Sequence, residues 1–152
     1  MAESQPPPGR PPGALAPLAE RALLVAFAIA LAATLGALFI GEIIGQMPCT
    51  LCWYQRIAMF PLVPVFGVAL WRADPQGALY AWPLTLAGLL LAAWHAGLYA
   101  GIVPRAIMPC SADGPSCTDS AQVILGLPIP YLSLAAFAAI TICLCFAGRP
   151  RS

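Results

Sequence analysis

The stretch ALLVAFAIALAATLGALFIGEII, residues 22–44, contains a single charged residue, Glu42, close to its end. A helix rises about 1.5 Å per residue, so roughly 20 apolar residues cross a hydrocarbon layer about 30 Å thick. The stretch is therefore predicted to be a membrane-spanning helix. It is longer than the core of a cleaved signal peptide and no convincing small-residue cleavage site follows it, so we expect it to be retained.

Three more apolar stretches have the length of a membrane span, at about Leu51–Leu70, Leu79–Ile102 and Ile129–Ala147. The whole chain is 61% hydrophobic and only 9% charged, whereas a soluble domain carries about 25% charged residues. The predicted fold class is therefore all-α, a polytopic membrane protein built as a bundle of four transmembrane helices. This domain should occupy residues 21–148.

The two ends of the chain are predicted to be tails. Six prolines fall within the first 17 residues, so residues 1–20 are expected to be disordered. Residues 149–152 form a short second tail. The net charge is only +1, which argues against the dense basic surface of a nucleic-acid-binding protein.

The arginines predict the orientation, because cytoplasmic loops of membrane proteins are enriched in positive charge. If both termini are cytoplasmic, only Arg56 and Arg105 lie toward the opposite face. The other arginines then lie on the cytoplasmic side: Arg10, Arg21, Arg72, Arg149 and Arg151. Two cysteine pairs then face outward, into a compartment where disulfides persist.

The first pair is Cys49 and Cys52, a C-x-x-C motif at the start of the second span. Two thiols three residues apart at a helix N-terminus suit a reversible disulfide, because the helix dipole stabilises a thiolate there. Arg56 lies one turn beyond Cys52, and its charge should lower the thiol pKa. An arginine in a span is costly, which indicates interfacial placement, a function, or both; a snorkelling interfacial arginine is the plainer reading.

The second pair, Cys110 and Cys117, lies in a polar segment with Gly114 and Pro115 between the cysteines. A disulfide can close this six-residue gap, either as a structural staple or as a redox group that another thiolate can reach. Thr118 or Asp119 could then cap a short interfacial helix that reaches Leu125.

The remaining cysteines and the histidine lie within predicted spans. Cys143 and Cys145 point to different helix faces and are expected to be packing residues. His95 is an intramembrane ionisable residue and hence a functional candidate, although a neutral histidine bonded between helices is equally compatible. A zinc site needs about four ligands, so Cys49 and Cys52 would have to recruit the second pair; we predict no metal.

Three segments together resemble the DsbB/BdbC family of membrane disulfide oxidoreductases. They are PCTLCWYQRIAMFPL at 48–62, PCSADGPSC at 109–117 and LGLPIPYLSLAAF at 125–137. The resemblance covers residues 22–147, and the short gap between the loop cysteines is closer to the BdbC branch. The vitamin K epoxide reductase family also has four helices and two cysteine pairs, but its C-x-x-C lies near the end of the core. A non-enzymatic membrane protein with structural disulfides or metal is the alternative from another class.

The resemblance implies an enzyme that reoxidises a soluble, DsbA-like thioredoxin-fold thiol oxidase and passes the electrons to a membrane quinone, ubiquinone or menaquinone. By position, Cys110 matches the cysteine that the partner attacks, and Cys117 matches its disulfide mate. Cys49 and Cys52 match the membrane-proximal pair, with Cys52 next to the quinone. Arg56 matches the arginine that holds the quinone ring, and His95 is a further candidate there. The implied location is the bacterial inner membrane, where the enzyme supports disulfide formation in exported proteins.

Overall fold

The computed structural model describes residues 17–74, 76–104, 117, 123–124 and 126–148. Within these residues, four helical segments are long and apolar enough to cross a membrane. The elements in chain order are α1 (Pro17–Leu38), which continues into the π-helical turn η1 (Phe39–Ile43), α2 (Thr50–Met59), α3 (Leu62–Trp71), α4 (Gly77–Tyr99), β1 (Val123–Ile124), β2 (Leu127–Pro128) and α5 (Ile129–Ala147). The predicted all-α, four-helix membrane fold is confirmed.

The bounds of the spans follow the hydropathy closely; α4 is shifted by two or three residues at each end, and two other differences affect the helices themselves. The last span begins and ends as predicted, but α1 begins at Pro17, so residues 17–20 are helical rather than part of a tail. The second span is divided into α2 and α3 at Pro61, which is the N-cap of α3. Proline has no N–H to donate to the preceding turn, and it clashes with that turn, so the helix breaks there.

The segment before α5 is also different from the expectation. The prediction of a short helix that reaches Leu125 is wrong at the C-terminal end of that helix, because Val123 and Ile124 form β1 and pair antiparallel with β2. Gly126 in the turn has φ 83°, a conformation that glycine adopts without a steric cost. The start of the predicted helix lies outside the described residues.

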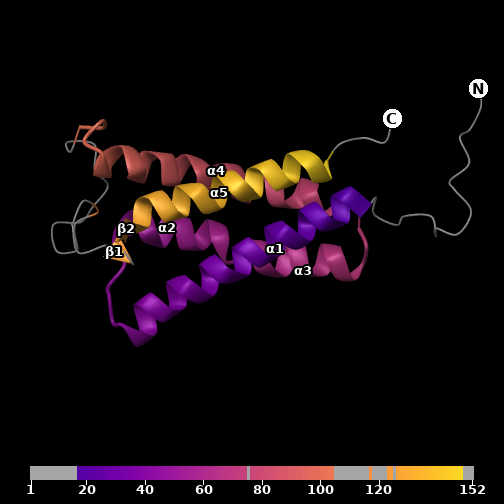
Figure 1. The fold of residues 1–152 in the computed structure, drawn as a ribbon, viewed down its shortest axis with the longest axis horizontal. Helices are drawn as coiled ribbons and strands as arrows, with labels where there is room; N and C mark the ends of the chain where they lie inside the picture. The colour runs from indigo at the N-terminus through magenta and orange to yellow at the C-terminus, as the bar shows by residue number, and fades with distance from the viewer. Residues whose placement is uncertain (1–16, 75, 105–116, 118–122, 125, 149–152) are drawn as a thin grey trace, which may run out of the picture.

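The helices pack as a bundle in which α5 lies against both α1 and α4 (Figure 1). Helix α4 also packs on α2 and α3, and α3 packs on α1. The α4–α5 contact is very close, because a Cβ added at Gly88 would collide with the ring of Phe137. Small residues allow this approach, which is how helices in a bilayer gain packing energy.

Helix α1 is embedded over only part of its length. Its buried residues all lie before its last two turns: Ala19, Ala22, Leu23, Ala26 and Ala30. The second half, with η1, diverges from the bundle (Figure 1). The divergence leaves space between α1, α2 and α5, and this space is part of the site described next.

Candidate active site

The C-x-x-C pair lies at the N-terminus of α2, at the opposite end of the bundle from the start of α1 and the end of α5 (Figure 1). Cys49 is the extended N-cap residue, and its carbonyl accepts the first helical hydrogen bond from Trp53 at 3.0 Å. The Sγ atoms of Cys49 and Cys52 lie 3.2 Å apart. The motif therefore brings its two sulfurs close enough for a disulfide to form with a small movement, and its redox role stays a prediction.

The surroundings of Cys49 favour its thiolate. The Cys52 thiol, hydrogen-bonded to the Cys49 sulfur, holds the pKa of Cys49 well below its usual value, and this outweighs burial, which raises it. Hydrogen bonds from the side chains of His95 and Cys117, and from the Cys52 backbone, lower it further. The stabilised thiolate at Cys52 that the sequence predicted stays a prediction.

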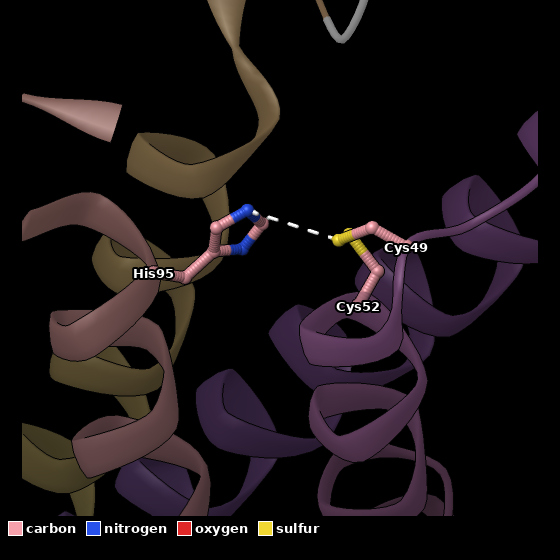
Figure 2. A group of neighbouring side chains, drawn as sticks. All are labelled: Cys49, Cys52 and His95. Atoms are coloured by element: carbon pink, nitrogen blue, oxygen red, sulfur yellow. Dashed lines mark hydrogen bonds between the residues drawn. The ribbon is translucent and has the colours of Figure 1, made fainter. Parts of the chain in front are cut away.

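His95 faces this pair from α4, as Figure 2 shows. The ring is fully buried, and its Nε2 lies 3.9 Å from the Cys49 sulfur. The same Nε2 lies 3.0 Å from the backbone carbonyl oxygen of Cys117, and Nδ1 lies 3.2 Å from Nε2 of Gln55. His95 therefore connects α2, α4 and Cys117, for which the family resemblance implies a redox role.

Cys49, Cys52 and His95 also resemble part of a metal site, since one ligand atom of each lies within 4.8 Å of the others. A structural zinc site takes four ligands and needs an unprotonated ring nitrogen toward the ion. Here the nitrogen toward Cys49 also lies at donor distance from a carbonyl oxygen, which accepts but cannot donate. That nitrogen carries the proton, so the set does not fit a metal ion in this arrangement.

A cavity of about 450 Å³ is lined in part by Cys52. Its walls come from the second half of α1, from α2 and from α5, and they are almost entirely apolar. Among the described residues that line it, Arg56 is the single charged one, and Cys52 is the single cysteine. The cavity suits an apolar ligand with a polar group that can reach Arg56.

Arg56 is fixed at the edge of this cavity. Its Nη2 donates to the carbonyl oxygen of Ala37 at 2.8 Å, and its guanidinium lies 5.4 Å from the centroid of the Trp53 ring. A Cβ added at Gly41 would lie 3.3 Å from both terminal nitrogens, so the guanidinium fits against a glycine. Bonds to a carbonyl and an aromatic face help to offset the cost of placing this charge near hydrocarbon.

The predicted site residues are distributed as follows. Cys49, Cys52 and His95 come together with Cys117, which is fully buried and packs in one cluster with Cys49, Leu51 and Leu98. Arg56 and Cys52 share the cavity, but His95 is not among the residues that line it. Cys110 lies outside the described residues.

Two features of the site were missed in the sequence. Gln55 is only 6% exposed and bonds His95, and a polar residue one position before Arg56 in a span was a signal that could have found it. The small residues of α1 that form the cavity wall, such as Gly36 and Ala37, carry no such signal. Cys143 is half-buried against the core, consistent with a packing role.

The fold and the site define a class: a four-span membrane protein with a buried dithiol at one end of its bundle, next to an apolar cavity. Comparison with known proteins then gives the family. The family model described as "Disulfide bond formation protein DsbB" matches residues 19–147. The chain therefore belongs to the DsbB family and is a membrane disulfide formation protein with disulfide oxidoreductase activity.

Individual relatives agree with this family. The "Probable disulfide formation protein" of Metapseudomonas resinovorans is 48% identical over 128 residues, which cover 84% of this chain and 89% of the relative. "Disulfide bond formation protein C" of Bacillus subtilis is 35% identical over 132 residues, 86% of this chain and 94% of the relative. No solved structure matches the chain. The resemblance to the DsbB/BdbC family is confirmed, and the vitamin K epoxide reductase alternative loses its support.

Proposed function

We propose that the protein oxidises the dithiol of a soluble thioredoxin-fold partner and transfers the electrons to a membrane quinone. The observation that carries the proposal is the position of the C-x-x-C pair. Cys49 packs beside Cys117, whereas Cys52 lines an apolar cavity together with Arg56. One sulfur thus adjoins Cys117, and the other adjoins a space suited to a lipid-soluble acceptor.

Electrons then pass through the sulfurs in a fixed order. A thiolate of the partner attacks Cys110 of the Cys110–Cys117 disulfide, and Cys117 leaves as a thiolate. Cys117 attacks Cys49, so that a Cys49–Cys117 disulfide forms, the Cys49–Cys52 bond breaks and Cys52 leaves as a thiolate. The partner's second thiolate then attacks the partner's own sulfur in the mixed disulfide and releases Cys110. The partner ends as a disulfide, and its electron pair is held on the protein's cysteines.

The last transfer returns the membrane-proximal pair to its disulfide. Cys110 and Cys117 re-form their bond as Cys117 is displaced from Cys49, and Cys49 and Cys52 become a disulfide again. A bound quinone would accept two electrons and two protons in this step. Arg56, with its guanidinium held between Ala37 and Trp53, would stabilise negative charge that develops on the quinone oxygen.

The cavity fits such an acceptor in chemistry as well as in size. A quinone ring is flat and apolar apart from its two oxygens, and its isoprenoid tail prefers lipid. The walls offer mostly apolar side chains from α1 and α5, and α2 adds Cys52, Gln55 and Arg56; the other polar lining residues are Gln46 and Ser133. We place this site at the outer face of the bacterial inner membrane, with both termini in the cytoplasm.

The experiment is quinone reduction, followed by absorbance, with purified protein and a reduced thioredoxin-fold partner. Soluble analogues of ubiquinone and menaquinone are supplied in separate reactions. We expect turnover in the wild type and its loss in both Cys52→Ser and Cys110→Ser, by a factor on the order of 10⁴ as for other essential nucleophiles. Cys143→Ala is the matched control and should keep full activity.

Two results would count against the proposal. Turnover that survives in Cys52→Ser would remove this sulfur from the route. Folded wild-type protein that reduces neither quinone would favour the alternative of a membrane protein with structural disulfides, and metal content that depends on Cys49 and Cys52 would favour metal binding.

A further inference from the structure

A buried polar network joins α2, α4 and Cys117, and the electron route described above does not use it. Its members are the side chains of Gln55 and His95 and the backbone carbonyls of Leu91 and Cys117. His95 is fully buried and Gln55 nearly so. Polar groups are costly to bury unless they are hydrogen-bonded, so a network in this position needs a reason to be there.

The network fixes which ring nitrogen of His95 carries the proton. Gln55 Nε2 lies 3.4 Å from the carbonyl oxygen of Leu91. Because a carbonyl only accepts hydrogen bonds, the atom of the Gln55 amide that faces Leu91 is the nitrogen and not the oxygen. The same nitrogen lies 3.2 Å from His95 Nδ1. Because the amide donates, Nδ1 is the acceptor, and the neutral ring holds its proton on Nε2.

The proton on Nε2 points to the chain that carries the second cysteine pair. Nε2 lies 3.0 Å from the Cys117 carbonyl oxygen and 3.9 Å from the Cys49 sulfur, so its proton is shared, with the stronger bond to the carbonyl and the weaker one to the sulfur. The bond to the carbonyl restrains the backbone of Cys117 and does not involve its sulfur, which is the reacting atom in the proposed exchange. It holds that backbone at the place where the side chain packs beside Cys49.

We propose that His95 is a positioning residue that holds the backbone of Cys117 beside Cys49, and that Gln55 keeps His95 in the tautomer required for this bond. The inference rests on the proposed function, in which Cys117 and Cys49 exchange a disulfide. Exchange between two sulfurs is fast when they are held in contact, because the entropy of bringing them together has already been lost. His95 acts in this step through the backbone and touches no acceptor in the cavity.

The test measures how strongly the protein favours a Cys49–Cys117 disulfide. The parent variant carries Cys52→Ser and Cys110→Ser, so that only this pair can form across the site, and Cys143→Ala with Cys145→Ala to remove the other thiols. The protein is equilibrated in detergent with reduced and oxidised glutathione. The disulfide fraction gives the effective concentration of one thiol at the other.

Adding His95→Leu should lower this effective concentration about tenfold, the effect of one lost buried hydrogen bond. His95→Gln places an amide donor near the position of Nε2 and should stay within about threefold of the parent. Gln55→Leu removes the bond that selects the tautomer of His95. The effective concentration should then fall by a factor between those expected for His95→Gln and His95→Leu. The matched control is Thr85→Val, since Thr85 is a buried residue of the same helix whose hydroxyl donates to the carbonyl oxygen of Ala81, one turn back in that helix.

An effective concentration in His95→Leu within twofold of the parent would overturn the inference. If thermal unfolding in detergent shows that His95→Leu does not fold, Gln55→Leu is used in its place. An effective concentration in Gln55→Leu equal to that of the parent would then overturn the inference. A parent that forms no Cys49–Cys117 disulfide would also refute it. The assay contains no quinone and no partner protein, so a failure of the proposed electron transfer would leave its outcome unchanged.

Discussion

Helix α2 has two very different sides. Toward α4, the side chains of Cys49 and Gln55 meet a fully buried histidine, and the polar atoms there find partners within hydrogen-bond distance. Toward α1 and α5, Cys52 and Arg56 face a cavity of about 450 Å³ with apolar walls, and Gln55 also contributes to its lining. The two cysteines of one motif therefore belong to two environments.

The difference explains why a three-residue spacing is useful here. Exchange between sulfurs needs a packed site in which one sulfur is held against another, and it gains nothing from empty space. A diffusible acceptor needs an open, apolar space with a charge at its edge. A pair whose sulfurs lie 3.2 Å apart at the helix N-terminus can serve both sides without any large movement.

The largest effect on the cavity side alone should come from Arg56→Ala. Losing a charged hydrogen-bond donor to the acceptor should raise the KM for quinone about 10- to 100-fold. The Cys49–Cys117 equilibrium, which belongs to the α4 side, should not change. The measurement is quinone kinetics beside the glutathione equilibrium.

Arg72→Ala is the control for Arg56→Ala, because Arg72 follows α3 at the other end of the bundle and is exposed. Unchanged quinone kinetics in Arg56→Ala would refute the role of Arg56. A loss in both assays would mean that the two sides of α2 are not separate.

Much of the fold could be predicted because span hydropathy is a local property. The last span was found to the residue, and α1 continues as a single span through η1. The break at Pro61 was missed, since proline within a span can also be accommodated without a break. The cavity could not be predicted, because it depends on the angle at which the second half of α1 leaves the bundle, and no local pattern encodes that angle.

The second prediction fills the cavity. Gly36 lines it, and a Cβ added there meets no atom within 4 Å, so the side chain of Gly36→Leu begins in open space beside the cavity. The KM for quinone should rise about tenfold, since a side chain of this size removes contact area worth roughly 1–3 kcal/mol. The thermal stability should not fall, because leucine is a better helix former than glycine.

Leu38→Phe is the control for this variant, because it adds bulk to an exposed position of the same helix that does not line the cavity. An unchanged KM in Gly36→Leu would mean that the acceptor binds elsewhere. A decrease in the partner's oxidation at saturating quinone would mean instead that the substitution reaches the α4 side.

The site was predictable only where its residues are close in sequence. Cys49, Cys52 and Arg56 were identified because a C-x-x-C and an arginine one turn later form a local pattern. The pairing of Gln55 with His95 joins positions 40 residues apart and depends on how α2 packs against α4. The sequence therefore proposed His95 for quinone binding, while the structure places it at the cysteine pair and outside the cavity lining.

The smallest effect should come from Gly41→Ala, which tests how closely Arg56 is held. The new methyl group would lie 3.3 Å from both terminal guanidinium nitrogens, a tight contact that a flexible side chain relieves by moving a few tenths of an ångström. We expect the KM for quinone to rise about threefold, less than 1 kcal/mol. Replacing a helical glycine by alanine also stabilises the folded state by roughly 0.5–1 kcal/mol.

The two effects of Gly41→Ala thus have opposite signs, which separates displacement of Arg56 from general damage to the protein. Thermal unfolding in detergent and quinone kinetics, measured on the same preparation, distinguish displacement of Arg56 from general damage. Gly67→Ala on α3 is the control, because its Cβ makes only an ordinary contact with Phe27 and lies away from the cavity lining. If Gly41→Ala binds quinone as tightly as Gly67→Ala does, the guanidinium can act from a shifted position. The bond to Ala37 would then stabilise the helix pair without setting the geometry of the acceptor site.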